Sequence, residues 1–518
     1  MRSVRIRILA ILAVLVIAGV GAWQLLPSNE VKSDPIAVGT TDEVTSLDPA
    51  GAYDAGSWAM YSNIYQSLMT FKSGATVPEP DAAESCQFIG QKLQTYQCKL
   101  RDDLSFSNGR KITAADVKYS VERMIKIKTD VGPWILFPSL KNVVADGRTI
   151  TFNLSSRDAT FPQKLATGAG SIVDRETYPP NKLRSGNTVD GSGPYLLKSY
   201  RPDATAELVP NPRYKGALKK TGVPVTVRYF KESDALLAAW KAGQIDVTHR
   251  QLPPATLAEL NPGDPDLRVT EADSAEIRNL VFNVRESSPL ANKKVRQAIA
   301  SIVDRAPLVT DIYKGTVEPL YSLIPQGYIG HSTPFFDAYP APDPARAKKL
   351  MQEAGVQTPL AITFAYRGGD EAYAQETAEL RRQLEADGLF KVSVKAVDWQ
   401  KFQKEYAAGK YDAYTVGWLP DYPDPDTFSQ PLVGHDNSLH NGYSSKKMDS
   451  LISSTLQYSD RGRTSADFKE LQALVGEDVP LVPLWQKKDY VISKTDVSGS
   501  QYLSDGTGIW RLWELRWI

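Results

Sequence analysis

Histidine and cysteine are scarce in this chain of 518 residues, which has four histidines and two cysteines. So few imidazole and sulfur ligands argue against a metal-rich protein or a scaffold held by many disulfides. An excess of charge is also lacking, because 60 Lys and Arg residues balance 60 Asp and Glu residues. Without a strongly basic surface, nucleic acid is not an expected partner.

Motifs of common enzymes are absent or misplaced. The chain has no G-x-S-x-G elbow, no G-x-x-x-x-G-K-[ST] phosphate loop and no H-E-x-x-H zinc motif. Residues 444–447 match S-x-x-K and residues 220–222 match K-T-G, but their order is the reverse of that in penicillin-binding enzymes. His435 and His440 stand among Asn and Ser residues typical of a solvated loop rather than a metal site. We therefore expect a protein that is not an enzyme and that uses no cofactor.

The amino-terminal segment directs the rest of the chain out of the cytoplasm. Three arginines in the first seven residues precede an apolar run over 8–26, interrupted only by Gln24. As a helix this run would span roughly 28 Å, near the hydrocarbon thickness of a bilayer, with its arginines in the cytoplasm. Residues 20–22 are small enough for a cleavage site, so residues 1–35 are either a signal peptide or, as we favour, a retained membrane anchor. No cysteine lies nearby to carry a lipid.

The two cysteines flank a stretch that resembles a β-hairpin. Cys86 and Cys98 enclose residues 87–97, which have Gly90 near their middle and alternating apolar residues at both ends. In an exported chain, cysteines on facing strands should form a disulfide, which stabilises the fold by about 3 kcal/mol. A metal pair is the alternative, but it lacks the further ligands of a tetrahedral site.

Strand-like runs alternate with amphipathic helical stretches from residue 31 onward, which predicts mixed α/β lobes. Thr113 and Asp116 are typical of a helix start. The stretch 371–386 has an apolar stripe that indicates packing against a sheet. Further helices are expected over 233–242, 293–302 and 344–354.

The most unusual segment is residues 411–428, in which a strand ends at Gly417 and a loop rich in aromatic residues and carboxylates follows. Three prolines restrict this loop, so that Asp421 can be held in place at little entropic cost, as a carboxylate that binds an ammonium group requires. Asp424 and Asp426 are better explained as turn residues with local hydrogen bonds to the backbone.

This segment resembles the G-W-x-x-D-x-x-D-P-x-x-F signature of the family 5 extracellular solute-binding proteins, the dipeptide- and oligopeptide-binding subunits of ABC importers. Other blocks resemble that family in the same order along the chain. They are residues 43–49, 63–68, 100–117, 191–195, 283, 295–305 and 343–355.

The resemblance implies a type II periplasmic-binding-protein fold, in which two α/β lobes close over a ligand. After residues 1–35, it implies a first lobe built from three separate parts, an extra subdomain and a second lobe. The expected ranges are 36–70, 183–280 and 495–518 for the first lobe, 71–182 for the extra subdomain and 281–494 for the second lobe.

Roles for individual residues also follow from the resemblance. Asp421 would pair with the α-ammonium group of a peptide, and Trp418 would line the pocket beside it. Arg367 follows a predicted strand, where a guanidinium suits a ligand carboxylate, although a solvated loop arginine would look the same. Val44 and Thr45 match the strand that presents backbone groups to the peptide.

The expected partners are a short peptide, an ABC permease with its ATPase, and the membrane through the amino-terminal helix, with the protein itself a monomer. A different solute on the same fold is the alternative, since such lobes accept several ligands. A metal chelate, a sugar-derived compound and a signalling peptide are the alternatives considered.

Overall fold

The computed structural model describes residues 34–518 except 219–221, 250–251 and 505. The predicted amino-terminal helix lies outside the described residues, and none of the described helices is long and apolar enough to cross a membrane. The centre of the molecule is an eleven-stranded sheet, in which β13 (Val317–Pro319) pairs with β17 beside the main path. In spatial order the other strands are β15 (Phe390–Val397), β14 (Leu360–Arg367), β16 (Ala413–Trp418), β12 (Leu267–Phe282), β17 (Leu481–Lys494), β11 (Val247–His249), β1 (Ile36–Thr40), β10 (Val225–Tyr229), β9 (Thr205–Pro210) and β8 (Tyr195–Arg201).

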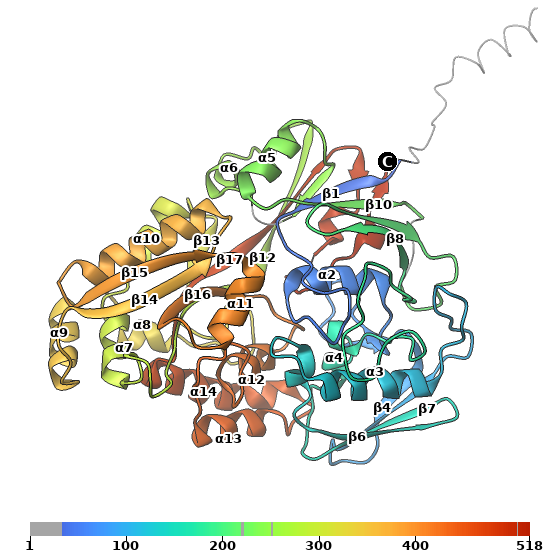
Figure 1. The fold of residues 1–518 in the computed structure, drawn as a ribbon, viewed down its shortest axis with the longest axis horizontal. Helices are drawn as coiled ribbons and strands as arrows, with labels where there is room; N and C mark the ends of the chain where they lie inside the picture. The colour runs from blue at the N-terminus through green and yellow to red at the C-terminus, as the bar shows by residue number, and fades with distance from the viewer. Residues whose placement is uncertain (1–33, 219–221, 250–251, 505) are drawn as a thin grey trace, which may run out of the picture.

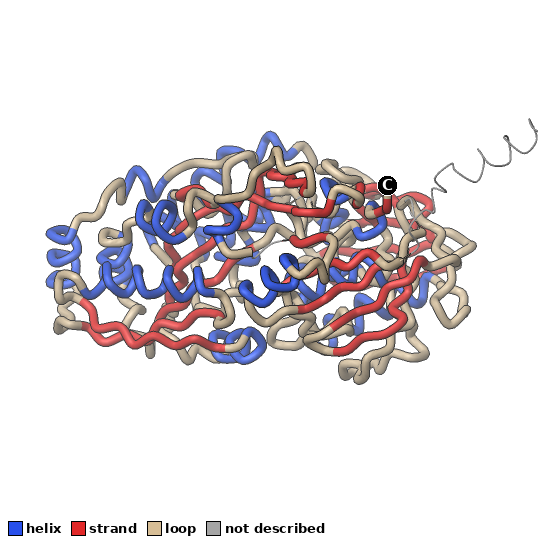
Figure 2. The backbone as a smooth tube through the Cα atoms, turned by 90° about the horizontal axis from the view of Figure 1, so that it is seen from above, coloured by secondary structure: helices blue, strands red, loops and turns tan. Residues whose placement is uncertain are grey.

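Two large apolar cores divide the molecule into two lobes (Figure 1). Lobe I contains β1, β8, β9, β10 and β11, and lobe II contains β14, β15 and β16, so the predicted mixed α/β fold is confirmed. Seen from above, strands occupy both halves of the elongated molecule (Figure 2).

The long strands β12 and β17 run from one lobe into the other. The end of β17 pairs with β11 of lobe I, whereas the end of β12 pairs with β16 of lobe II. Between these two regions the pairing of β12 with β17 is irregular, with a register shift between Asp273 and Ile277. A break in a ladder allows the strands to bend locally, and this one lies between the stretch that pairs with lobe I and the stretch that pairs with lobe II.

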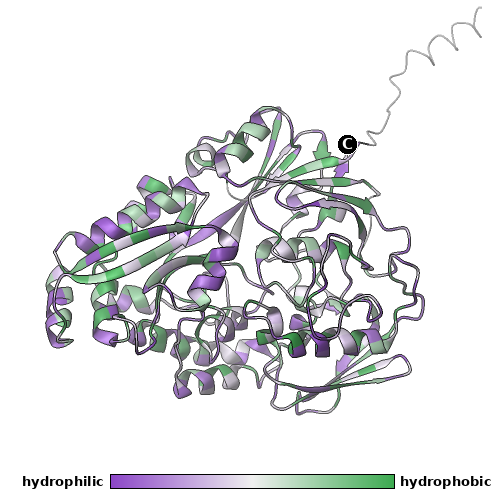
Figure 3. Ribbon diagram, in the orientation of Figure 1, coloured by the Kyte–Doolittle hydropathy of each residue, from purple (hydrophilic) through white to green (hydrophobic). Residues whose placement is uncertain are grey.

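Helices cover the sheet and largely match the predicted ranges. The helices α5, α7, α9 and α10 begin at the predicted residues and end one or two residues early. Helices of lobe II carry both hydrophilic and hydrophobic residues along their length, as surface helices with one buried face do (Figure 3). The helices are α2 (Ala55–Ile64), α3 (Ala114–Ile127), α4 (Phe161–Lys164), α5 (Ser233–Lys241), α6 (Pro254–Ala258), α7 (Lys293–Ala300), α8 (Pro334–Ala338), α9 (Pro344–Glu353), α10 (Glu371–Glu385), α11 (Trp399–Ala407), α12 (Gln430–Val433), α13 (Lys446–Thr455) and α14 (Ser465–Asp478).

A separate four-stranded sheet packs with α3 beside lobe I. Its order is β4 (Ala83–Phe88), β5 (Thr95–Leu100), β7 (Thr149–Leu154) and β6 (Leu140–Asp146). Helix α3 begins after Thr113, as predicted, and the Asp116 carboxylate in its first turn accepts from the Thr113 amide at 2.9 Å. Two short ribbons complete the strands, β2 (Met69–Thr70) with β3 (Glu79–Pro80) and β18 (Val497–Ser498) with β19 (Arg516–Trp517).

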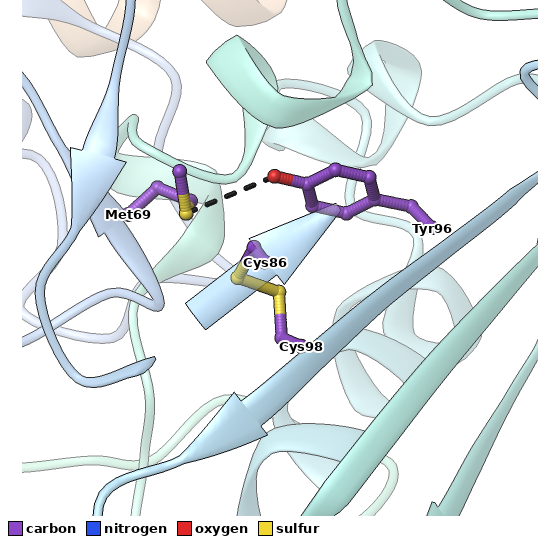
Figure 4. The surroundings of a disulfide bond; sticks show 4 residues. All are labelled: Met69, Cys86, Tyr96 and Cys98. Carbon is purple, nitrogen blue, oxygen red and sulfur yellow. Dashed lines mark hydrogen bonds between the residues drawn. A yellow bond between two sulfur atoms is a disulfide. The ribbon is translucent and has the colours of Figure 1, made fainter. Parts of the chain in front are cut away.

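The predicted disulfide is present in this sheet. Cys86 on β4 lies directly opposite Cys98 on β5, and the two sulfur atoms are bonded (Figure 4). Cys98 is fully buried, and the Tyr96 hydroxyl nearby donates to the sulfur of Met69 at 3.9 Å. The hairpin and its disulfide are therefore confirmed.

Replacing both Cys86 and Cys98 with serine is expected to lower the free energy of unfolding by up to about 3 kcal/mol, because the denatured chain loses a closed loop. Neither cysteine lines the cavity between the lobes, so ligand affinity should stay unchanged. Calorimetric melting of the oxidised protein and the double variant tests this. An unchanged melting temperature would show that the hairpin is held without the disulfide.

Candidate functional site

A cavity lies between the two lobes, and the space inside its walls and open mouth is about 1240 Å³. Lobe I contributes the start of α2 and the residues before it, lobe II contributes α11 and the end of β16, and the loop after α3 contributes a third wall. The aromatic lining residues are Tyr53, Trp58, Trp134, Tyr373, Trp399, Phe402, Tyr406 and Trp418. The ionisable ones other than tyrosine are Asp42, Asp54, Asp130, Glu276, Arg278, Arg367, Asp421 and His440.

Asp421 lies in the wall of this cavity, on the loop after β16. The Tyr53 hydroxyl of lobe I donates to its Oδ2 at 2.5 Å, and the Thr427 hydroxyl donates to the same oxygen at 3.2 Å. Oδ1 has no hydrogen-bond partner among the described residues and keeps some accessible surface. Burial raises the pKa of Asp421 to about 7, against the two hydroxyl groups, which lower it. The site thus holds a buried carboxylate without a contacting cation from the described chain.

Trp418 lines the same cavity and links Asp421 to the aromatic wall of lobe I. Its Nε1 donates to the Thr427 carbonyl at 2.9 Å, which fixes the ring. Tyr53 meets Trp418 edge to face at 5.5 Å and stacks on Trp58 at 5.0 Å. Such aromatic groups give apolar contact at low entropic cost, which suits ligand side chains.

Arg367 is the last residue of β14 and also lines the cavity. Its Nη2 donates to the Thr41 carbonyl of lobe I at 2.7 Å, and its guanidinium lies 5.6 Å from the centre of the Trp399 ring. Nε and Nη1 have no partner among the described residues. Arg367 therefore joins the two lobes and still has donors available.

Val44 and Thr45 do not line the main cavity. Val44 borders a neighbouring cleft, and the Thr45 hydroxyl donates to Asp54, the N-cap of α2. The Thr45 amide donates to the Ser57 hydroxyl at 3.0 Å. The structure thus brings Asp421, Trp418 and Arg367 together around the main cavity. Val44 and Thr45 lie beside it, and the role of their backbone in binding a peptide stays a prediction.

Several lining residues were not predicted, because no local motif marks them. Trp399, Phe402 and Tyr406 repeat at helical spacing on α11, a pattern that could have indicated an apolar face. Glu276 and Arg278 alternate on β12 and face the cavity together. Both patterns are visible in the sequence, but which face meets the other lobe depends on the tertiary fold.

The charges of the lining favour a cationic group in the ligand. Five carboxylates line the cavity against two guanidinium groups, and one of these, Arg278, is already paired with Glu376 at 3.0 Å. Burial lowers the pKa of His440, and Arg285 lowers it further, so this imidazole is neutral near pH 7. Among the described residues, no cluster of His, Cys, Asp and Glu is arranged to hold a metal ion.

Comparison with protein-family models assigns the chain to a family. The model described as "Bacterial extracellular solute-binding proteins, family 5 Middle" matches residues 77–439, well over half of the chain. The chain belongs to this family. The motif around Asp421 and most of the residues that line the cavity fall within the matched range, whereas Tyr53 and Trp58 of lobe I precede it.

Individual relatives of this family 5 protein agree in length as well as in sequence. The "Probable D,D-dipeptide-binding periplasmic protein DdpA" of Escherichia coli (strain K12) is 28% identical over 90% of this chain and 92% of its own length. The heme-binding protein A of Haemophilus influenzae is 26% identical over 84% of this chain and 82% of its own length. The structure of a dipeptide-binding protein from Pseudoalteromonas sp. SM9913 in complex with Met-Leu has the same fold, with a TM-score of 0.82. It is 19% identical, and the match covers 94% of this chain and 100% of that protein.

Proposed function

We propose that this family 5 protein captures short peptides between its lobes outside the cytoplasm and delivers them to an ABC importer. Asp421 binds the α-ammonium group of the peptide, and Trp418 packs against the first residue. Arg367 binds a carboxylate at the far end of the peptide, while the backbone near Val44 and Thr45 pairs with the peptide backbone.

The observation that carries this proposal is the state of Asp421. A carboxylate this deeply buried normally has a cationic partner, because desolvation of an isolated charge is costly. Its described partners are hydroxyl groups alone, and its free oxygen keeps accessible surface beside the cavity. An ammonium group from the ligand supplies the missing charge in a charge-assisted hydrogen bond.

Delivery to a membrane permease is supported by family membership. Three further parts of the proposal rest on the sequence. The amino-terminal segment is a membrane anchor or a signal peptide, and the protein is a monomer. The first lobe comprises residues 36–70, 183–280 and 495–518, the subdomain comprises residues 71–182, and the second lobe comprises residues 281–494. Crossing of both lobes by β12 and β17 is consistent with lobes assembled from separate segments.

Isothermal titration calorimetry of the purified protein with a panel of di-, tri- and tetrapeptides tests the function. The expected result is micromolar or tighter binding of some peptides without turnover. Heme, nickel chelates and sugar derivatives complete the panel as the alternative solutes. Binding of one of these with no binding of any peptide would overturn the proposal.

Peptide affinity is expected to fall as the pH falls below about 7. The pKa of Asp421 is raised to about 7 in the free protein, so this group is increasingly protonated at lower pH. A bound ammonium stabilises the ionised form, so binding releases a proton, and the affinity loss approaches about tenfold per pH unit. Calorimetry between about pH 5.5 and about pH 8 in buffers of different ionisation enthalpy measures this proton release. Affinity that rises in acid would contradict the role of Asp421.

A further inference from the structure

Arg278 on β12 presents an unpaired guanidinium nitrogen at the cavity. Its Nε donates to Glu376 at 3.0 Å and its Nη2 donates to the Thr415 hydroxyl at 3.0 Å. Nη1 has no partner among the described residues and is not shut off from the accessible space. Because only 3% of Arg278 is exposed and the residue lines the cavity, the surface that remains to Nη1 lies there.

The guanidinium of Arg278 is held rigidly in this position. It lies 3.8 Å from the centre of the Tyr373 ring, another lining residue. On its other side, Glu376 is fixed by donors from Tyr313 at 2.8 Å and Trp485 at 2.7 Å. A donor fixed in advance loses little entropy when it binds a ligand.

Arg278 and Arg367 serve the same end of the cavity. The Arg278 guanidinium lies over the Tyr373 ring, and both Arg278 and Arg367 lower the pKa of Tyr373, which burial raises. In the sheet, Arg278 is paired with Gly417 on β16, and β14, which ends at Arg367, lies on the other side of β16. Glu276 also faces this region, but Lys487 approaches it at 3.7 Å and offsets its charge.

A purely structural role explains only part of this arrangement. The Arg278–Glu376 pair ties β12 to α10, and for that purpose one nitrogen suffices. The third guanidinium nitrogen, Nη1, needs a hydrogen-bond acceptor, and water would satisfy it while no ligand is bound. A planar guanidinium with one free edge is suited to a carboxylate.

We propose that Arg278 is a second carboxylate-binding residue of the cavity, whose Nη1 binds a carboxylate of the peptide beside Arg367. This inference rests on the proposed function. The carboxylate is either the α-carboxylate of a very short peptide or the side chain of an acidic residue near its end. Arg278 then sets the preference for acidic over neutral ligands.

Calorimetry with two matched peptide pairs tests this proposal. The pairs are Ala-Ala with Ala-Ala amide, and Ala-Glu with Ala-Gln. The wild-type protein is expected to prefer the acid in at least one pair by about 10- to 100-fold, as for a hydrogen bond to a charged group. The pair that shows the preference identifies the α-carboxylate or the side chain as the group bound.

Two variants show whether Arg278 causes the preference. The double variant Arg278→Gln/Glu376→Gln avoids a buried unpaired carboxylate, and Arg278→Lys keeps the ion pair with Glu376 but leaves no nitrogen for the ligand. Each is expected to lose about tenfold or more of the preference, whereas the control Glu376→Gln keeps it. An unchanged preference in either folded variant would overturn the proposed role of Arg278 and would leave the proposed function of the protein intact. If the wild-type protein binds no peptide, the proposed function fails, and this inference fails with it.

Discussion

Replacement of Asp421 with asparagine is expected to weaken peptide binding by about 2–5 kcal/mol, or about 30-fold or more. The amide keeps the size of the side chain, and its oxygen can still accept from Tyr53, whose hydroxyl lies 2.5 Å from the carboxylate. The charge that we propose to pair with the peptide ammonium is lost. Because the loss occurs in a buried site, it is much larger than for an ion pair on the surface.

An acetylated peptide and a surface variant serve as controls for this result. Acetylation removes the ammonium group, so the wild-type protein and Asp421→Asn should bind the acetylated peptide equally weakly. Asp387→Asn makes the same substitution at an exposed position and should leave affinity unchanged. If Asp421→Asn binds the free peptide as tightly as the wild-type protein does, the ammonium site must lie elsewhere.

The structure shows the lobes in contact around the cavity, and these contacts bear on how a ligand enters. Tyr53 of lobe I bonds to Asp421, and Thr41 of lobe I accepts from Arg367 of lobe II. Both contacts join residues more than 300 positions apart in the chain. Opening of the lobes must break both hydrogen bonds. The two residues proposed to bind the ends of the peptide therefore also contact the opposite lobe when the lobes are closed.

Much of the fold could be predicted from the sequence because its signals are local. The starts of α7, α9 and α10 follow from caps and apolar spacing over a few residues, and the Cys86–Cys98 hairpin follows from alternation on both sides of a turn. The loop around Asp421 was found for the same reason, since its aromatic residues and prolines lie close together in the sequence.

The rest of the cavity could not be predicted, because it depends on pairings between distant strands. Arg278 meets the site only because β12 pairs with β16, which lies more than 130 residues later. Asp424 was interpreted as a turn residue, and its bond to the Asp426 amide at 3.0 Å agrees with this. Its bidentate pair with Arg461, 37 residues away, has no local signal.

Lys164 and its two carboxylates form a buried cluster between the subdomain sheet and lobe II. Its ammonium lies 2.9 Å from Asp158 and 3.8 Å from Asp426, and all three side chains are almost fully buried. Burial alone would lower the pKa of Lys164, but the two carboxylates outweigh burial and raise it. The cation is therefore present throughout the neutral range. The Thr160 hydroxyl also donates to Asp426 at 3.1 Å across this boundary.

Replacement of Lys164 with methionine is expected to lower the free energy of unfolding at neutral pH by about 3–5 kcal/mol, because two buried carboxylates lose their only contacting cation among the described residues. Adding Asp158→Asn in the same chain should restore part of this loss, because it removes one of the two unpaired charges. Urea denaturation of the single and double variants at neutral pH measures both effects, with exposed Lys92→Met as the matched control. Peptide affinity should fall as well, since Asp426 and Asp421 share one loop. A loss of stability that Asp158→Asn does not reduce would show that Lys164 acts through packing of its aliphatic chain rather than through its charge.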